Sequence, residues 1–215
     1  MLLESPNFHE SIPSKSGVSY SAMKRPKGIP ADDALEILLT GNLHFVENHQ
    51  EHASRATNVV RNLDQEQRPL AVYIGCSDAR VPPDVIFDTN LGDLYTVRTA
   101  GHVLGRTSIG TVEYAVAVLG VNLVVVLGHG NCGAVTSALS KDDTIGFAPV
   151  LEPIRERVEM AGGGMTVDEA VRLNARHTAE QLKLSRPVFE KMLAEGTLKI
   201  VPAYYDMKTG SVTLL

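Results

Sequence analysis

Apolar residues fall into two kinds of pattern along this chain. Short runs without polar alternation cover residues 70–74, 94–97, 123–127 and 198–202. A strand that is buried on both faces needs no polar positions, so such continuous runs favour a parallel sheet. Between them, apolar residues recur every three or four positions, which is typical of helices that bury one face. The pattern predicts an α/β domain in which about four parallel strands are flanked by helices.

The segments with helical spacing carry boundary signals of their own. In the stretch 31–49, acidic residues come first, where they favour the positive end of the helix dipole. The stretch "TSIGTVEYAVAVLG" stops at Gly120, and Thr166 with Glu169 forms a capping-box pattern. Pro187 interrupts the last helical pattern before the fourth strand. A turn at 208–210 is expected to lead into a short C-terminal edge strand.

Two segments differ in composition. Residues 1–30 are rich in Ser, Pro, Lys and Gly and have no apolar periodicity, so we expect an N-terminal arm that is disordered or docks on a partner subunit. Residues 31–215 are long enough for one domain with a proper core. We find no internal repeat that would suggest another arrangement.

Charge and hydropathy exclude some classes of partner. The formal net charge is -5 and Lys and Arg are not clustered, which argues against a nucleic-acid surface. The longest apolar stretch, 115–128, contains Gly120 and Asn122 and falls short of the ~18 residues that span a bilayer. The first residues carry Glu4 where a secretion signal would carry positive charge. We therefore expect a cytoplasmic protein without a membrane segment, acting on a small partner.

The chain has only two cysteines, and both follow predicted strands. Cys76 comes directly after the first strand in "LAVYIGCSDARVPPD", and "VVVLGHGNCGAV" places His129 and Cys132 after the third. Ligands of open α/β sheets bind outside the carboxyl ends of the strands. If the two strands are neighbours, two sulfurs and an imidazole converge there. Three such ligands with a fourth position open favour a catalytic rather than a structural Zn²⁺ site.

Asp78 and Arg80 extend this pattern. In extended backbone, side chains two residues apart share a face, so Cys76, Asp78 and Arg80 are expected to point the same way. A paired hydrogen bond from Arg80 would hold Asp78 and keep it ionised. The result is a base beside the open metal position.

Each of these residues, taken alone, is compatible with a simpler role. A buried cysteine is usually a small apolar residue, and an aspartate beside an arginine is often a surface ion pair. Cys76 and Cys132 could form a disulfide, but the Cys-x-x-Cys spacing of thiol oxidoreductases is missing. A nucleotide-binding module would need phosphate-binding glycines after the first strand, and "IGCSDARV" has none of the known patterns. The joint placement of the residues favours the metal site.

These residues match a known family. The pattern Cys-x-Asp-x-Arg followed by His-x-x-Cys resembles the β-class carbonic anhydrases, and the similarity continues through "GDLYTVRTAGHV", "IGTVEYAVAVLGV" and "IVPAYYDMKTGSV". It covers roughly residue 31 to the C-terminus. The resemblance implies a zinc-dependent lyase, a carbonate dehydratase with one Zn²⁺ per chain. Its reaction would be the reversible hydration of CO2 to bicarbonate and a proton by hydroxide on the zinc.

The resemblance also assigns roles to residues. Cys76, His129 and Cys132 would be the zinc ligands, and Asp78, restrained by Arg80, would accept a hydrogen bond from the hydroxide. Either water or Asp78 could be the fourth ligand at rest. Three further positions match substrate-binding positions of the family; without the resemblance, they would be a loop, a strand-core and a helix-face residue. They are Gln67, Tyr95 and Tyr114. The amide of Gly133 is also expected to bind bicarbonate, because backbone donors at a helix start bind anions.

The family implies a homodimer or a dimer of dimers, with each site lined partly by the neighbouring subunit. Members inhibited by bicarbonate at a separate site carry Trp three residues before the first zinc cysteine, where this chain has Tyr73, so we expect no such regulation. One alternative function shares the zinc motif. Relatives hydrolyse carbonyl sulfide or carbon disulfide, and the shape of the pocket rather than the ligands decides between these substrates.

Overall fold

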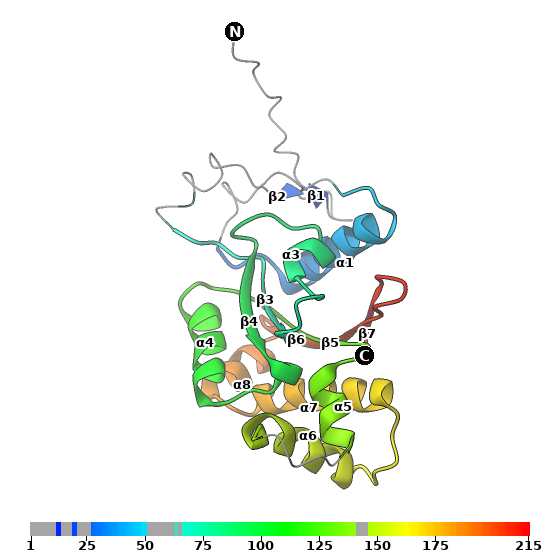
Figure 1. Cartoon of the computed structure of the whole chain (residues 1–215). Coiled ribbons are helices and arrows are strands. Elements are labelled where there is room, and N and C mark those ends of the chain that lie inside the picture. Colours follow the sequence, from blue (N-terminus) through cyan, green and yellow to red (C-terminus); the bar gives the residue numbers. More distant parts are fainter. Residues whose placement is uncertain (1–11, 14–18, 21–26, 51–62, 64–65, 141–145) are drawn as a thin grey trace.

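A five-stranded sheet forms the centre of the molecule (Figure 1). The computed structural model describes residues 12–13, 19–20, 27–50, 63, 66–140 and 146–215. The strand order is β4-β3-β5-β6-β7, in which the first four strands are parallel and β7 is antiparallel to β6. The bounds are Ala71–Cys76 for β3, Leu94–Thr99 for β4, Leu123–His129 for β5, Lys199–Tyr205 for β6 and Val212–Leu214 for β7. The predicted four parallel strands and short C-terminal edge strand are confirmed.

Helices connect these strands. Their bounds are Ala31–Val46 for α1, Pro83–Ile86 for α3, Arg106–Ala117 for α4, Gly133–Ser140 for α5, Ala148–Met160 for α6, Val167–Lys183 for α7 and Pro187–Ala194 for α8. A 3-10 turn, η1, covers Ala100–His102. A separate antiparallel pair joins β1 (Ile12–Pro13) to β2 (Ser19–Tyr20). The helices α5, α6 and α7 contact one another and lie together at the bottom of Figure 1.

Both faces of the central strands β3 and β5 are covered, which accounts for their lack of polar alternation. In the edge strand β4, by contrast, only Val97 is buried, so the run 94–97 is not the fully buried strand that the sequence predicted. Tyr73 and Val125 belong to a cluster on one face that includes side chains of α1, α5 and α6. Val72, Ile74 and Val124 belong to a second cluster with α4, α8 and the later half of α7. All six residues of β3 are buried. Each large apolar side chain buried in this way contributes about 1.5–3 kcal/mol to folding.

The ends of the C-terminal helices follow the sequence signals. The Glu169 backbone N–H donates to Thr166 Oγ1 at 3.3 Å, and the Thr166 N–H donates to Glu169 Oε2 at 2.8 Å, so the predicted capping box is confirmed. Pro187 lies in the first turn of α8, where its missing N–H costs no helical hydrogen bond. The proline therefore starts a new helix rather than bending α7.

Core packing includes a residue that lies before α1. Ile29 is buried in the core, and its carbonyl oxygen accepts a hydrogen bond from Asn122 Nδ2 at 3.0 Å. Most of the expected arm, residues 1–30, lies outside the described residues, and its role stays a prediction. Among the helices that the structure describes, none is both long enough and apolar enough to cross a bilayer.

The order of the strands decides where chemistry can take place. From β3 the chain continues to β4 on one side of the sheet, whereas β5 pairs with β3 on the other side. The carboxyl ends of β3 and β5 are therefore neighbours, with Gly75 opposite Leu127. Ligands of open α/β sheets bind at such a switch point. Cys76 is the last residue of β3, and His129 is the last residue of β5.

Candidate metal centre

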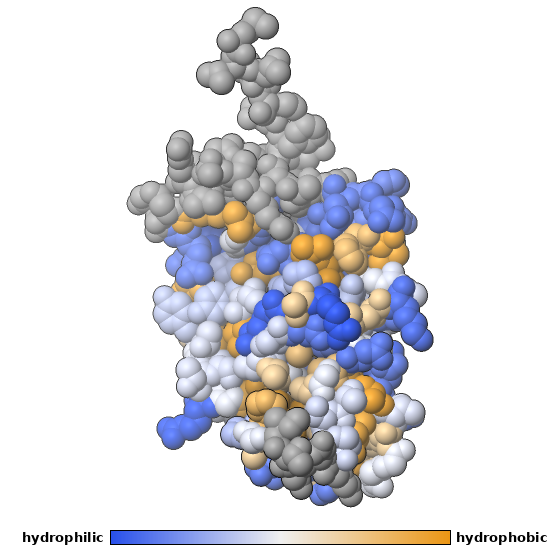
Figure 2. Space-filling view, viewed as in Figure 1, coloured by the Kyte–Doolittle hydropathy of each residue, from blue (hydrophilic) through white to orange (hydrophobic). Residues whose placement is uncertain are grey.

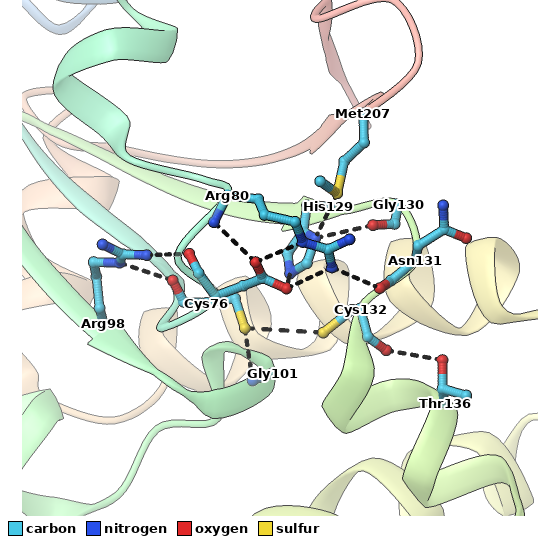
Figure 3. A network of polar contacts seen from close by, with 11 residues as sticks. Cys76, Arg80, Arg98, Gly101, His129, Gly130, Asn131, Cys132, Thr136 and Met207 are labelled. Atoms are coloured by element: carbon cyan, nitrogen blue, oxygen red, sulfur yellow. Dashed lines mark hydrogen bonds and ion pairs between the residues drawn. The ribbon is translucent and has the colours of Figure 1, made fainter.

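Cys76, His129 and Cys132 lie together at this end of the sheet (Figure 3). Their ligand atoms all lie within 4.8 Å of one another, and the two sulfur atoms are 3.9 Å apart. All three side chains are buried, with Cys132 fully inaccessible. The strand order supplies Cys76 and His129, and the turn from β5 into α5 supplies Cys132. The predicted convergence of the three residues is confirmed.

The contacts of the imidazole fix the direction of its lone pair. His129 Nδ1 lies 3.0 Å from the carbonyl oxygen of Gly130 and 3.4 Å from Met207 Sδ, so the Nδ1 atom carries the proton. The opposite atom, Nε2, is buried and has no hydrogen-bond partner among the described residues. An unsatisfied buried nitrogen costs about 1–3 kcal/mol. A metal ion would satisfy this atom, and two sulfurs with one imidazole nitrogen fit Zn²⁺.

A hydrogen bond joins the two thiol groups. The hydrogen bond from Cys132 is the largest influence on Cys76 and, against the opposing effect of burial, holds the pKa of Cys76 well below its usual value, with further help from the backbone N–H groups of Asp78 and Gly101. The same hydrogen bond, together with burial, raises the pKa of Cys132. One thiolate is thus already stabilised by protein groups. Zn²⁺ requires both sulfurs as thiolates and would displace the remaining proton.

Asp78 and Arg80 form a two-pronged ion pair beside the cluster. Arg80 Nε donates to Asp78 Oδ1 at 2.9 Å and Nη2 donates to Oδ2 at 2.7 Å, and Asp78 Oδ2 lies 3.9 Å from His129 Nε2. The Arg80 hydrogen bonds hold the pKa of Asp78 well below its usual range. The backbone here is a turn rather than the expected extended strand, because the Val81 N–H donates to the Asp78 carbonyl oxygen. The side chains meet as predicted, but the turn brings them together.

Arg98, a residue that sequence reasoning missed, clamps this loop. From β4, its Nε donates to the carbonyl oxygen of Cys76 at 2.8 Å and its Nη2 donates to that of Asp78 at 2.5 Å. Arg80 Nη2 also donates to the Asn131 carbonyl oxygen at 3.2 Å and so links the two ligand loops. Arg98 could have been found only from the strand register, which places it opposite Gly75.

The four expected substrate positions are spread over the chain. Gly133 is the first residue of α5, directly after Cys132, and a Cβ there would meet nothing within 4 Å. Tyr95 pairs with Val72, four residues before the end of β4, so it lies roughly 13 Å along the strand from the cluster. Gln67 is exposed and precedes β3, and Tyr114 on α4 is 47% exposed. Within one chain, only Gly133 lies next to the ligands.

Comparison with known proteins agrees with this geometry. The family model described as carbonic anhydrase matches residues 71–212. A carbonic anhydrase of Mycolicibacterium smegmatis is 40% identical over 189 residues, which cover 84% of this chain and 91% of the relative. The β-carbonic anhydrase CafA of Aspergillus fumigatus is 29% identical, with a TM-score of 0.68 over 85% of this chain and 91% of that chain.

A further solved structure shares the fold. One of two tetrameric β-carbonic anhydrases from Sordaria macrospora is 24% identical, with a TM-score of 0.67 over 82% of this chain and 94% of that chain. The family match covers both ligand loops and the four parallel strands of the sheet. With the fold, the buried Cys–His–Cys cluster and these similarities in agreement, this chain belongs to the β-class carbonic anhydrases.

Proposed function

We propose that this protein catalyses the reversible hydration of CO2 to bicarbonate and a proton, with one Zn²⁺ per chain held by Cys76, His129 and Cys132. The observation that carries the proposal is the buried cluster of three ligands, in which His129 Nε2 has no partner among the described residues. An ionised carboxylate, Asp78, lies beside it. The family membership supports this reaction over the hydrolysis of carbonyl sulfide or carbon disulfide.

When bound, Zn²⁺ acidifies water and so supplies hydroxide near neutral pH. Two thiolates and a neutral imidazole bring the formal charge of the ion to zero, so the acidification is weaker than with three neutral ligands. A carboxylate that can only accept hydrogen bonds is then valuable. Asp78, kept ionised by Arg80, would accept a hydrogen bond from the attacking hydroxide and so orient its free lone pair toward the carbon of CO2.

Arg80 keeps Asp78 in this position. Its guanidinium holds both carboxylate oxygens and is tethered to the Asn131 carbonyl oxygen on the other ligand loop. Asp78 is thereby prevented from turning toward the ligand cluster and becoming a fourth ligand. The amide of Gly133, at the N-terminus of α5, is a donor for the bicarbonate product.

We further propose a homodimer or dimer of dimers in which Gln67, Tyr95 and Tyr114 line the partner's site. In support, the described surface exposes large apolar side chains, which mark interaction surfaces when they gather. Figure 2 shows apolar residues gathered over α1 and α3, where Leu43 is 52% exposed. The relatives from Sordaria macrospora are tetrameric. Light scattering on the purified protein measures the assembly.

A cytoplasmic location is part of the same proposal. Both cysteines are free thiols in the structure, and their role as metal ligands requires that they stay reduced. Reducing compartments maintain thiols in that state. Fractionation of the source cells tests the location.

The test of the proposed function measures bound zinc and CO2 hydration on wild type, Cys132→Ser and Ser140→Ala. Ser140 is an exposed residue of the same helix, α5, and serves as the control. We expect about one zinc per chain and activity in wild type and control, and the loss of both in Cys132→Ser. A wild type that is active without metal would overturn the proposal. Assays with carbonyl sulfide and carbon disulfide on the same samples separate the alternative substrates.

A further inference from the structure

A backbone amide contacts one of the candidate ligands from an unusual conformation. The Gly101 N–H donates to Cys76 Sγ at 3.3 Å (Figure 3). Gly101 and the next residue, His102, both have left-handed backbones, with φ of 60° and 48°. Such a conformation is unfavourable for a non-glycine residue and persists only where surrounding groups hold it. This turn therefore needs other groups that hold it in place.

The side chain of Asn174 on α7 holds this turn. It is buried, and Nδ2 donates to the carbonyl oxygen of Gly101 at 2.8 Å and lies 2.9 Å from His102 Nε2. Both hydrogens of the Asn174 amide group thus bond to the two residues with left-handed backbones, Gly101 and His102. Asn174 fixes the carbonyl group of Gly101, and the N–H group of Gly101 is directed at Cys76 Sγ.

Arg157 on α6 fixes the orientation of Asn174. Its Nη1 donates to Asn174 Oδ1, and also to Thr178 Oγ1 at 3.0 Å, while its Nη2 donates to Gln181 Oε1 at 2.8 Å. A guanidinium can only donate, so it keeps the amide oxygen on its own side and the NH2 group on the side of Gly101. A continuous series of polar contacts connects the exposed Gln181 to the Cys76 sulfur.

We propose that Asn174, oriented by Arg157, is a positioning residue of the metal centre that holds the Gly101 N–H on the Cys76 sulfur. The inference rests on the proposed function in one respect, namely that this sulfur is a zinc ligand. An N–H group that donates to a thiolate withdraws electron density from it and fixes its position before the metal arrives. Groups that orient ligands in this way typically change metal affinity by about 10- to 100-fold.

The experiment compares Asn174→Ala with Asn42→Ala. Asn42 is also buried, and it too uses its amide on backbone groups, those of Ile86, Gly210 and Val212, but none of these is a metal ligand. Zinc affinity is measured by competition with a chelator. Each protein is also loaded with Co²⁺, and the thiolate-to-cobalt charge-transfer band is recorded.

We expect Asn174→Ala to bind zinc about 10-fold or more weakly, because the sulfur is no longer held in position. We also expect the charge-transfer band to move to lower energy, because the sulfur regains electron density. Asn42→Ala should lose stability without either change. Equal spectra and affinities for wild type and Asn174→Ala, or equal shifts in the two variants, would overturn the inference. If Asn174→Ala does not fold, Arg157→Gln, which removes the charge that orients Asn174, should move the band in the same direction by less. A wild type that binds no metal would instead refute the proposed function.

Discussion

The Asp78 carboxylate lies between the Arg80 guanidinium, which donates to both of its oxygens, and His129 Nε2, which is 3.9 Å from Oδ2. A charged acceptor is thus held at the edge of the ligand cluster by a cation that also donates to the Asn131 carbonyl oxygen on the second ligand loop. Because Arg80 is exposed and makes these contacts through a planar fork, its geometry matters more than its charge.

Arg80→Lys is therefore expected to reduce kcat/KM for CO2 hydration by about 10- to 100-fold while zinc content stays unchanged, since lysine cannot grip both oxygens. Stopped-flow assays and metal analysis on the same samples measure the two quantities. Arg176→Lys, on the exposed side of α7, is the matched control and should behave like wild type. Full activity in Arg80→Lys would show that the fork is dispensable.

Mixing two inactive variants tests whether Gln67 acts across subunits. Cys132→Ser removes a zinc ligand, and Gln67→Ala removes the proposed substrate contact while leaving zinc bound. If Gln67 serves the partner's site, mixed dimers contain one complete site and activity reappears after co-refolding. No gain over the sum of the separate proteins would place Gln67 in its own chain's site or outside the reaction.

Gly41 is a tight contact between α1 and the end of α3. A Cβ at this position would lie 1.9 Å from the Phe87 carbonyl oxygen, and a backbone atom cannot move aside like a side chain. We expect Gly41→Ala to lower the free energy of unfolding by about 1–3 kcal/mol or more. Gly110→Ala, in a helix with nothing within 4 Å of the added carbon, should instead be neutral or stabilising. Urea denaturation of both variants measures the difference.

His102 is expected to make stability depend on pH. Burial is the main cause that lowers its pKa to about 3. Cys76 acts in the opposite direction, and Arg157 and His129 lower the pKa further. Between about pH 6.5 and about pH 3 the unfolded chain binds the proton and the folded chain does not, so stability falls by about 1.4 kcal/mol for each pH unit in that window. Above it the effect vanishes.

His102→Asn isolates this effect, because asparagine tolerates the left-handed backbone and does not titrate. Urea denaturation from about pH 7 to about pH 5 should show a shallower loss in the variant than in wild type. The difference between the two proteins cancels the contributions of other groups. Parallel loss in both proteins would show that His102 titrates normally in the folded state.

The pattern of apolar runs was enough to predict the fold. Strands buried on both faces need apolar residues at every position, and residues 70–74 and 123–127 form such continuous apolar runs. The ligand residues were predictable for a related reason. Residues that follow parallel strands meet at one edge of the sheet, so Cys76, His129 and Cys132 could be assigned once their strands were taken as neighbours.

The surroundings of the ligands were decided only by the tertiary structure. Arg98 reaches the Cys76 loop across β4, and Asn174 reaches Gly101 from a helix 73 residues later in the chain. Neither residue carries a local pattern, because a hydrogen bond between distant segments depends on register, on side-chain length and on backbone conformations such as the left-handed turn at Gly101. Periodicity along the chain thus determined the sheet and the ligands, while packing between distant elements determined which groups orient them.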